Sequence, residues 1–339
     1  MRAVMLKDYG SFDQLVMADV PRPVPAADEV LVKVAYAGLR WGDVMQCNGF
    51  PSRVRPTPFV AGQEAAGVVE AVGSAVRDVA PGARVVALTM SGAWAEYVCV
   101  PAARLVQLPD RVSLAQALIY PVNLLTAYYA VMVWAKVQPG ERVLLHAAAG
   151  GVGLLTLQII KRKLRDVQVV ALASSEDKLQ LAREHGADYA INYKTHDYVA
   201  EINRIFGPKA TGFMTGGERG GGVDVSLNGV SGSTLQTDPQ VIRKRGRWVI
   251  YGWAGGRGEL NTASFGYDGI TIMPFSSIAW MGTPEHEAGQ RFVRAWLEEE
   301  PLLEPSVYSL SQASEAMRAL SGGATRGKVV LHIGDAPCS

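Results

Sequence analysis

Cysteine is scarce in this chain: among 339 residues only Cys47, Cys99 and Cys338 occur. Three widely separated cysteines cannot form a four-cysteine zinc site, and low cysteine use is typical of a reducing compartment, so we predict a cytoplasmic protein. An excess of one charge is missing too, because 33 Lys and Arg are balanced by 32 Asp and Glu. Binding to nucleic acid needs a basic excess that releases phosphate counterions, so no nucleic-acid partner is expected.

Long hydrophobic runs are also rare. The N-terminus becomes polar too early for the apolar core of a signal peptide. Residues 143–160 lack any charged side chain and are long enough to cross a membrane, but a Gly-Gly-Val-Gly turn lies in their middle, and His146 and Gln158 interrupt them. We therefore expect a buried strand, a tight turn and a helix in this stretch, and no membrane span.

The chain's length is greater than one hydrophobic core usually serves, so we expect two domains. Residues 1–120 contain several short alternating segments bounded by glycine or proline, which predict a small β-barrel. These segments cover 29–36, 67–73, 83–88 and 97–101. A closing segment, 327–333, is a strand that could rejoin this barrel.

From about Leu124 the pattern changes to alternating strands and helices, which predicts an α/β domain with a doubly wound parallel sheet covered on both faces, the Rossmann architecture. The expected strands are 142–146, 168–173, 189–193, 223–228 and 247–252, and the expected helices are 127–136, 151–164, 175–185, one that ends at Phe206, and 284–299. A glycine-rich segment, 207–222, interrupts the alternation. It is either a tolerated insertion, which we favour, or a mobile flap.

One turn in this domain has the pattern of a dinucleotide-binding loop. After the strand at 142–146 the sequence runs Ala147-Ala-Ala-Gly-Gly-Val-Gly and then becomes helical. Small residues let the backbone approach a pyrophosphate, and the helix N-terminus supplies free N–H groups and a positive dipole end. The candidate cofactor-binding residues of this turn are Ala149, Gly150, Gly151, Val152 and Gly153.

The end of the second strand favours NADPH over NADH. NAD sites normally place Asp or Glu there, to accept the ribose 2′-hydroxyl. Here the strand runs into Ser174 and Ser175, with Lys178 one turn further along. Hydroxyl donors and a cation suit a 2′-phosphate, although Lys178 is also explained as a solvated helix-face lysine.

At this point the sequence resembles the quinone oxidoreductase branch of the medium-chain dehydrogenases, which includes zeta-crystallin. The resemblance extends in order over nearly the whole chain, and parts of it are closest to the vesicle amine transport protein relatives. It is carried by His146-Ala-Ala-Ala-Gly-Gly-Val-Gly, Pro121-Val-Asn-Leu-Leu-Thr-Ala-Tyr, Ser91-Gly-Ala-Trp-Ala-Glu-Tyr-Val-Cys-Val-Pro, Asn192-Tyr-Lys-Thr-His-Asp-Tyr-Val-Ala-Glu-Ile and the closing Gly-Lys-Val-Val-Leu.

The resemblance implies a GroES-like β-barrel catalytic domain formed by residues 1–121 and 266–339. A Rossmann NADPH-binding domain would be inserted at 122–265, and the active cleft would lie between the two. It further implies a homodimer joined through edge strands, for which 270–275 is the candidate segment. It also assigns cofactor-binding positions outside the glycine turn, namely Tyr193 near the 2′-phosphate, Thr126 and Tyr129 at the nicotinamide, and the loops of Asn228, Tyr251 and Gly252.

Zinc-dependent relatives place a cysteine shortly before an Asp, and later a Gly-His-Glu. Here the cysteine position is Arg40, before Asp43, and the histidine position is Gln63, before Glu64. A guanidinium cannot ligate zinc and an amide oxygen is a poor substitute for imidazole, so we predict no metal. Cys47 lies past the Asp and is better explained as a small buried residue.

Without a Lewis acid, hydride transfer needs an acceptor that is already electron-poor, and the developing oxyanion needs a donor. The quinone oxidoreductase branch usually has Asn at the Arg40 position, so this arginine is a departure. Arg40 is a candidate donor, and Tyr129 or solvent supplies the proton. Gln63 completes the candidate catalytic set. Arg40 is equally explained by an ion pair with Asp43 or Glu64, or by a contact with the cofactor phosphates.

Three functions remain open at this stage. The leading one is NADPH-dependent reduction of a small-molecule conjugated acceptor, namely a quinone, an enone or an enoyl compound. The second is hydride addition to a polyene that triggers cyclisation or reduction in polyketide or macrolactam biosynthesis. The third, of another class, is a non-catalytic NADPH-binding protein.

Overall fold

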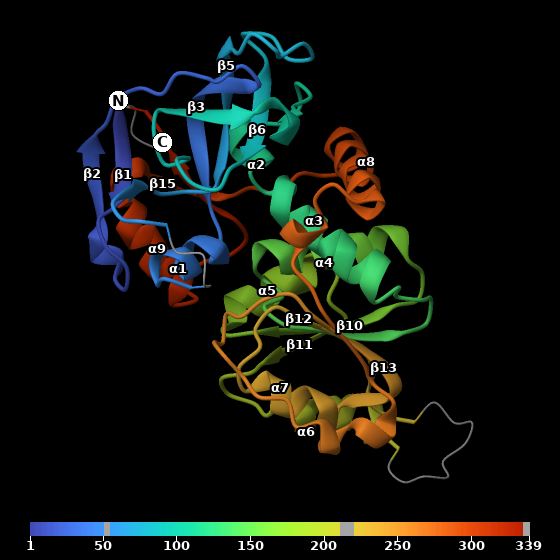
Figure 1. Cartoon of the computed structure of the whole chain (residues 1–339). Helices are drawn as coiled ribbons and strands as arrows, with labels where there is room; N and C mark the ends of the chain where they lie inside the picture. Colours follow the sequence, from blue (N-terminus) through green and yellow to red (C-terminus); the bar gives the residue numbers. More distant parts are fainter. Residues whose placement is uncertain (51–54, 211–219, 335–339) are drawn as a thin grey trace. The chain divides into compact units, whose positions relative to one another are not determined.

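The computed structural model describes residues 1–50, 55–210 and 220–334 (Figure 1). The chain forms two compact units. Unit 1 contains Met1–Pro121 and Val293–Ser339, and unit 2 contains Val122–Phe292. Cys338 and residues 211–219 of the glycine-rich segment, which the sequence leaves as an insertion or a flap, lie outside the described residues.

Unit 1 is built mainly from antiparallel strands, and only β15 and β16 among its described strands pair in parallel. A small sheet has the order β2-β1-β4, and a larger one has the order β15-β16-β3-β5-β6-β8, with β7 paired to β3. The strands are β1 (Arg2–Leu6), β2 (Leu15–Asp19), β3 (Glu29–Leu39), β4 (Phe59–Val60), β5 (Glu64–Val72), β6 (Arg84–Leu88), β7 (Tyr97–Pro101), β8 (Leu105–Gln107), β15 (Ser306–Ser309) and β16 (Val329–His332).

Strand β3 is the centre of unit 1 because it pairs with β5, β7 and β16. Its residues Val30, Val32 and Val34 are buried, as the alternating sequence predicts. The expected return of the C-terminal strand is confirmed, since β16 pairs antiparallel with β3. The α-helices α1 (Trp41–Cys47), α2 (Leu114–Ala117) and α9 (Ala313–Ser321) also belong to this unit.

Unit 2 contains one parallel sheet of six strands in the order β11-β10-β9-β12-β13-β14. Counted along the chain, this is the order 3-2-1-4-5-6 of a doubly wound fold, which reverses direction between β9 and β12. The Rossmann prediction is therefore confirmed. The strands are β9 (Arg142–Leu145), β10 (Gln168–Ala173), β11 (Tyr189–Asn192), β12 (Val223–Asn228), β13 (Ile242–Ile250) and β14 (Thr271–Pro274).

Helices cover both faces of this sheet. Figure 1 shows α4 and α5 on one face and α6 and α7 on the other. The helices of the unit are α3 (Leu125–Tyr128), α4 (Gly151–Lys163), α5 (Glu176–Glu184), α6 (Tyr198–Phe206), α7 (Thr234–Thr237) and most of α8 (Pro284–Glu299). Residues 266–292, which the sequence assigned to the catalytic domain, lie in unit 2, because β14 extends its parallel sheet.

Strand β13 begins five residues earlier than expected. Residues 243–246 form an irregular bulge in this strand, because its register with β12 shifts so that Val223 faces Ile242 and Val225 faces Arg247. Within this bulge Arg245 has a φ of 59°, which departs from extended strand backbone. A period-2 pattern is broken by such a bulge, so the sequence predicts only the second half of the strand.

The apolar stretch 143–160 is confirmed as a strand, a turn and a helix, namely β9 and α4 with the glycine turn between them. A different segment, Leu114–Trp134, is a helix long and apolar enough to cross a membrane, and 67% of its most apolar window is buried inside the protein. A buried core helix of a soluble protein has the same length and composition, so this helix is weak evidence for a span.

Candidate functional site

The glycine turn follows β9 and begins α4. Ala147 has a φ of 50°, and the N–H of Gly150 donates to the carbonyl of Ala147 at 2.9 Å, which closes the turn. A Cβ on Gly153 would lie 2.5 Å from the carbonyl oxygens of Ala147 and Ala148, so only glycine fits this position. The first turn of α4 carries no acidic side chain, which leaves its positive dipole end available to an anion.

The ends of β10 and β11 bring the predicted 2′-phosphate residues together. Because Ala173 pairs with Asn192 in parallel register, the next residues, Ser174 and Tyr193, lie side by side at the carboxyl ends of these two strands. The Lys178 ammonium lies 3.5 Å from the Ser174 hydroxyl, and the ring of Tyr193 is half exposed. Ser175 instead donates to the carboxylate of Asp177, an acceptor that competes with a 2′-phosphate for this hydroxyl.

The loops after β12 and β13 pack on each other. The Ser231 hydroxyl donates to the carbonyl of Gly252 at 2.7 Å, and the Tyr251 N–H donates to the carbonyl of Asn228 at 2.9 Å. A Cβ on Gly252 would lie 2.3 Å from the Gly229 carbonyl oxygen. Gly252 is therefore required for the close approach of the two loops.

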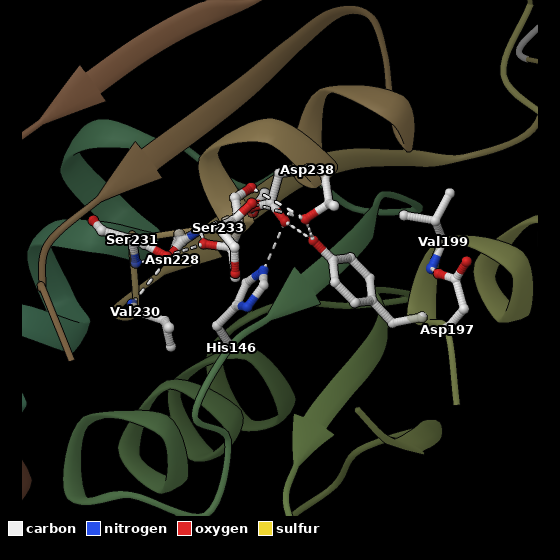
Figure 2. Close-up of polar contacts among 12 residues, drawn as sticks. His146, Asp197, Val199, Asn228, Val230, Ser231, Ser233 and Asp238 are labelled. Atoms are coloured by element: carbon white, nitrogen blue, oxygen red, sulfur yellow. Dashed lines mark hydrogen bonds and ion pairs between the residues drawn. The ribbon is translucent and has the colours of Figure 1, made fainter. Parts of the chain in front are cut away.

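One carboxylate, that of Asp238, links the ends of β9 and β12. We call this group the Asp238 cluster; its members are His146, Tyr198, Ser226, Asn228 and Asp238. Figure 2 shows the labelled His146, Asn228 and Asp238 converging from different elements. Asp238 Oδ1 lies 2.9 Å from His146 Nε2 and accepts from the Tyr198 hydroxyl at 2.7 Å. Its Oδ2 accepts from Ser226 at 2.7 Å and from Asn228 at 2.8 Å.

Asp238 is fully buried. Burial alone would raise its pKa, but the His146 imidazole and the surrounding donors hold the pKa of this carboxyl below its ordinary value. The carboxylate is therefore ionised at neutral pH and only accepts hydrogen bonds. Burial also raises the pKa of Tyr198, whose hydroxyl stays protonated and donates.

The helical segment that carries Thr126 and Tyr129 passes from α3 into a π-helical turn, η4 (Tyr129–Trp134). The Thr126 hydroxyl donates to Ser277 at 3.2 Å. Tyr129 is fully buried, packs edge-on against Phe275, and its hydroxyl lies 3.3 Å from Nδ1 of His286. Burial raises the pKa of Tyr129 to about 12 and lowers that of His286, so the phenol is protonated at neutral pH.

In unit 1 the Arg40 guanidinium donates to the side-chain oxygen of Gln63. We call the group around this contact the Arg40 cluster; its members are Arg40, Asp43, Gln63, Glu64 and Lys328. Asp43 accepts from the backbone N–H of Arg40 at 2.9 Å, and Lys328 forms an ion pair with Glu64. Glu64, which the sequence offered as a partner for Arg40, is thus paired with Lys328.

The Arg40 cluster contains several buried polar atoms that no other group in the described ranges satisfies. Within the part of the chain that the structure describes, Arg40 Nε, Asp43 Oδ1 and Glu64 Oε1 are buried and have no hydrogen-bond partner. Burial raises the pKa of Asp43 to about 6, although the Arg40 guanidinium opposes this shift. Among the described residues, no group of three or more His, Cys, Asp or Glu side chains is arranged to hold a metal ion.

Several residues in these contacts are not among the predicted site residues, including Asp238, His286 and Lys328. Asp238 follows a short helix without any recognisable motif, and His286 is one polar position on an amphipathic helix. Lys328 belongs to the closing Gly-Lys-Val-Val-Leu, which carries part of the family resemblance. That motif is the one local signal in the sequence for these three residues. Asp238 lies 92 residues from its partner His146, and His286 lies 157 residues from its partner Tyr129.

A GroES-like antiparallel domain and a doubly wound sheet with a glycine turn at the end of its first strand define a medium-chain dehydrogenase. Two family models match the chain accordingly: the alcohol dehydrogenase GroES-like domain over residues 26–110 and the zinc-binding dehydrogenase over residues 151–293. The probable quinone oxidoreductase of Schizosaccharomyces pombe is 31% identical over 328 residues, which cover 94% of this chain and 92% of that protein. The chain therefore belongs to the quinone oxidoreductase-type medium-chain dehydrogenase/reductases, a family of oxidoreductases.

The synaptic vesicle membrane protein VAT-1 homolog of Rattus norvegicus is 35% identical over 256 residues, or 75% of this chain. The matched region covers about 60% of that relative's length. Among solved structures, the quinone oxidoreductase of Escherichia coli complexed with NADPH is 26% identical, with a TM-score of 0.84, and the match covers 98% of this chain and 100% of that one.

Proposed function

We propose that this protein is an NADPH-dependent reductase that delivers hydride, without zinc, to a conjugated small molecule such as a quinone, an enone or an enoyl compound. The observation that carries the proposal is the contact between Arg40 and Gln63. These residues occupy the two positions at which zinc-dependent relatives place cysteine and histidine, and here they form a cationic hydrogen-bonded pair.

The residues of unit 2 fit a dinucleotide. Gly153 and Gly252 lie where a Cβ would collide with backbone, and the first turn of α4 offers free N–H groups. We assign the pyrophosphate to the turn from Ala149 to Gly153, and the 2′-phosphate to Ser174, Ser175, Lys178 and Tyr193. Thr126 and the loops of Asn228, Tyr251 and Gly252 would hold the ribose and nicotinamide parts. The NADPH complex of the similar Escherichia coli protein supports this cofactor.

When bound, NADPH supplies a hydride ion, which carries two electrons to the electron-poor carbon of the acceptor. The Arg40 guanidinium then donates hydrogen bonds to the oxygen on which negative charge develops. Gln63 accepts from the guanidinium and fixes its direction. Tyr129, protonated at neutral pH, or solvent returns one proton, so that the acceptor gains H⁻ and H⁺ in total.

This arrangement favours conjugated acceptors. A saturated ketone accepts hydride more readily when a Lewis acid polarises its carbonyl, whereas a quinone or enone already spreads the added charge over its π-system. A guanidinium donor suits quinones and enones, because one preorganised donor to a developing oxyanion contributes roughly 10²–10³ to kcat.

The test is NADPH oxidation by the native protein with quinones, enones, enoyl thioesters, conjugated polyenes and, as a control, saturated ketones. We expect turnover with the first three and none with the ketones. Turnover with polyenes alone would favour the biosynthetic alternative. Tight NADPH binding with no acceptor that accelerates its oxidation would instead support the non-catalytic alternative.

Zinc independence is tested separately. The purified protein is expected to contain far less than one zinc per chain by elemental analysis, and its activity is expected to survive dialysis against a chelator. Stoichiometric zinc together with chelator-sensitive activity would contradict the proposal.

We further propose that unit 2 provides the cofactor domain, that unit 1 provides the catalytic domain, and that the protein is a cytoplasmic homodimer. Strand β14 supports the dimer, because it is the last strand of its sheet and leaves one backbone edge for a second copy. Light scattering of the native protein, compared with a Met273→Pro variant in the middle of β14, tests this arrangement. A monomeric native protein would overturn it.

A further inference from the structure

The Asp238 cluster lies at the point where the parallel sheet changes winding direction. Strands β9 and β12 are neighbours in the sheet, and the chain winds away from them in opposite directions. Ligands of doubly wound folds bind outside the carboxyl ends of the strands at this point. His146 directly follows β9 and Asn228 is the last residue of β12, and Asp238 contacts both.

The side chain of Asn228 shows how the cluster controls a loop. Its Nδ2 donates to Asp238 Oδ2 and to the Thr234 hydroxyl, each at 2.8 Å. Its Oδ1 accepts the backbone N–H groups of Val230 and Ser231, also at 2.8 Å each. All four hydrogen-bonding positions of this amide are therefore used.

An ionised carboxylate has no proton to donate, so Asp238 dictates which way the Asn228 amide faces. The NH₂ group must point to Asp238, and the oxygen is left to point at the loop. The loop needs that oxygen, because Ser231 has a φ of 58°, a left-handed conformation that is strained for a residue other than glycine. The same carboxylate thereby stabilises a strained turn that it does not touch.

A similar relation holds on the β9 side. His146 is almost fully buried, lies 2.9 Å from Asp238, and packs edge-on against the ring of Tyr198. The next residue, Ala147, has a φ of 50° and begins the glycine turn. The turn after β9 and the loop after β12 therefore both begin next to a residue that contacts the Asp238 carboxylate.

We infer that Asp238 is a positioning residue for the cofactor, which presets the turn after β9 and the loop after β12 before NADPH arrives. This inference rests on the proposed function. Asp238 is fully buried beneath these turns and acts through His146 and Asn228 without touching the cofactor itself. Preorganisation of this kind improves affinity by lowering the entropic cost of ordering the turns.

The test replaces Asp238 by asparagine, which keeps the size of the side chain but can present NH₂ toward Asn228. The Kd for NADPH, measured by fluorescence titration, is expected to rise about tenfold, as is usual when an outer partner that orients a ligand group is lost. The KM for NADPH should rise in parallel, while kcat at saturating NADPH stays within about twofold. A merely structural role would not separate KM from kcat in this way.

Asp224 provides a matched control. It is also fully buried but lies near the start of β12, at the opposite end of that strand from Asn228, where it accepts from the Arg142 N–H and pairs with Arg243. Asp224→Asn is expected to lower the unfolding temperature as Asp238→Asn does, without changing the Kd for NADPH. Equal NADPH affinity in the two folded variants would overturn the inference.

If Asp238→Asn does not fold, His146 replaces it as the site of the test. His146→Leu removes the donor to Asp238 and should weaken NADPH binding, whereas His146→Gln keeps an N–H donor and should restore it. Equal affinity in both His146 variants would overturn the inference. A native protein that binds no NADPH would overturn the proposed function instead, so the two failures are distinguishable.

Discussion

The Asp238 cluster of unit 2 and the Arg40 cluster of unit 1 are both buried and polar, yet they differ in how completely their atoms are paired. Asp238 accepts four hydrogen bonds and the Asn228 amide makes four. In the Arg40 cluster, three buried atoms lack a partner among the described residues. Satisfied networks rigidify a fold, and buried polar atoms without partners are costly and call for an explanation.

This difference in hydrogen bonding indicates a different role for each cluster. A satisfied cluster has nothing left to offer a ligand directly, so the Asp238 cluster acts on the cofactor only through the backbone turns that it holds. The Arg40 cluster has three polar atoms that can still form hydrogen bonds, and the Arg40 guanidinium carries a permanent positive charge. Chemistry on a substrate is therefore expected in unit 1 and cofactor positioning in unit 2, and four experiments can break or sharpen this comparison.

The largest effect is expected from Arg40→Met. Loss of the only oxyanion donor that we assign should lower kcat by roughly 10²–10³ while the Kd for NADPH stays unchanged. Steady-state kinetics with a quinone measure this, and Arg104→Met, at an exposed position of unit 1, is the control. An Arg40→Met enzyme with native kcat would remove Arg40 from the mechanism.

The second experiment concerns the stability of unit 1 as the pH changes. Burial raises the pKa of Asp43 to about 6 from an ordinary value of 3.8, so the folded state binds this proton more tightly than the unfolded state does. The free energy of unfolding should therefore fall by up to about 3 kcal/mol as the pH rises from about 4 to 6.

Urea unfolding of the native protein and of Asp43→Asn across this range measures the contribution of Asp43. The difference between the two free energies of unfolding should change with pH in the stated direction. A pH-independent difference would mean that Asp43 is not the group that titrates.

A smaller effect is expected from Gly153→Ala. The new Cβ would meet two backbone oxygens at 2.5 Å, so the turn must widen, and the free energy of unfolding should fall by about 1–3 kcal/mol. NADPH affinity should fall with it. Gly266→Ala is the control, because no atom lies within 4 Å of its added Cβ. Equal NADPH affinity in both variants would argue against a pyrophosphate at this turn.

The smallest effect concerns cofactor preference. Ser174→Asp places a carboxylate where a 2′-phosphate would bind and where NAD sites accept a ribose hydroxyl, so the ratio of NADPH to NADH affinity should drop about tenfold. Glu176→Asp, on the neighbouring exposed helix start, is the control that keeps the local charge constant. An unchanged ratio for Ser174→Asp would place the 2′-phosphate elsewhere.

By itself the sequence determined the alternating pattern of unit 2, the glycine turn between β9 and α4, and the losses at Arg40 and Gln63. Each of these depends on neighbours within a few residues: side-chain periodicity, a turn that tolerates only small residues, or the chemistry of one side chain. The strands β3, β10 and β12 were predicted within a few residues for this reason.

Only the tertiary structure decided the rest. The bulge in β13, the pairing of Lys328 with Glu64, and the contact of Tyr129 with His286 join parts of the chain whose local patterns give no hint of a partner. Asp238 is the clearest case, because His146 lies 92 residues before it and the sheet alone brings them together. Buried polar groups must find partners wherever the fold places them, and that requirement becomes visible only once the fold is known.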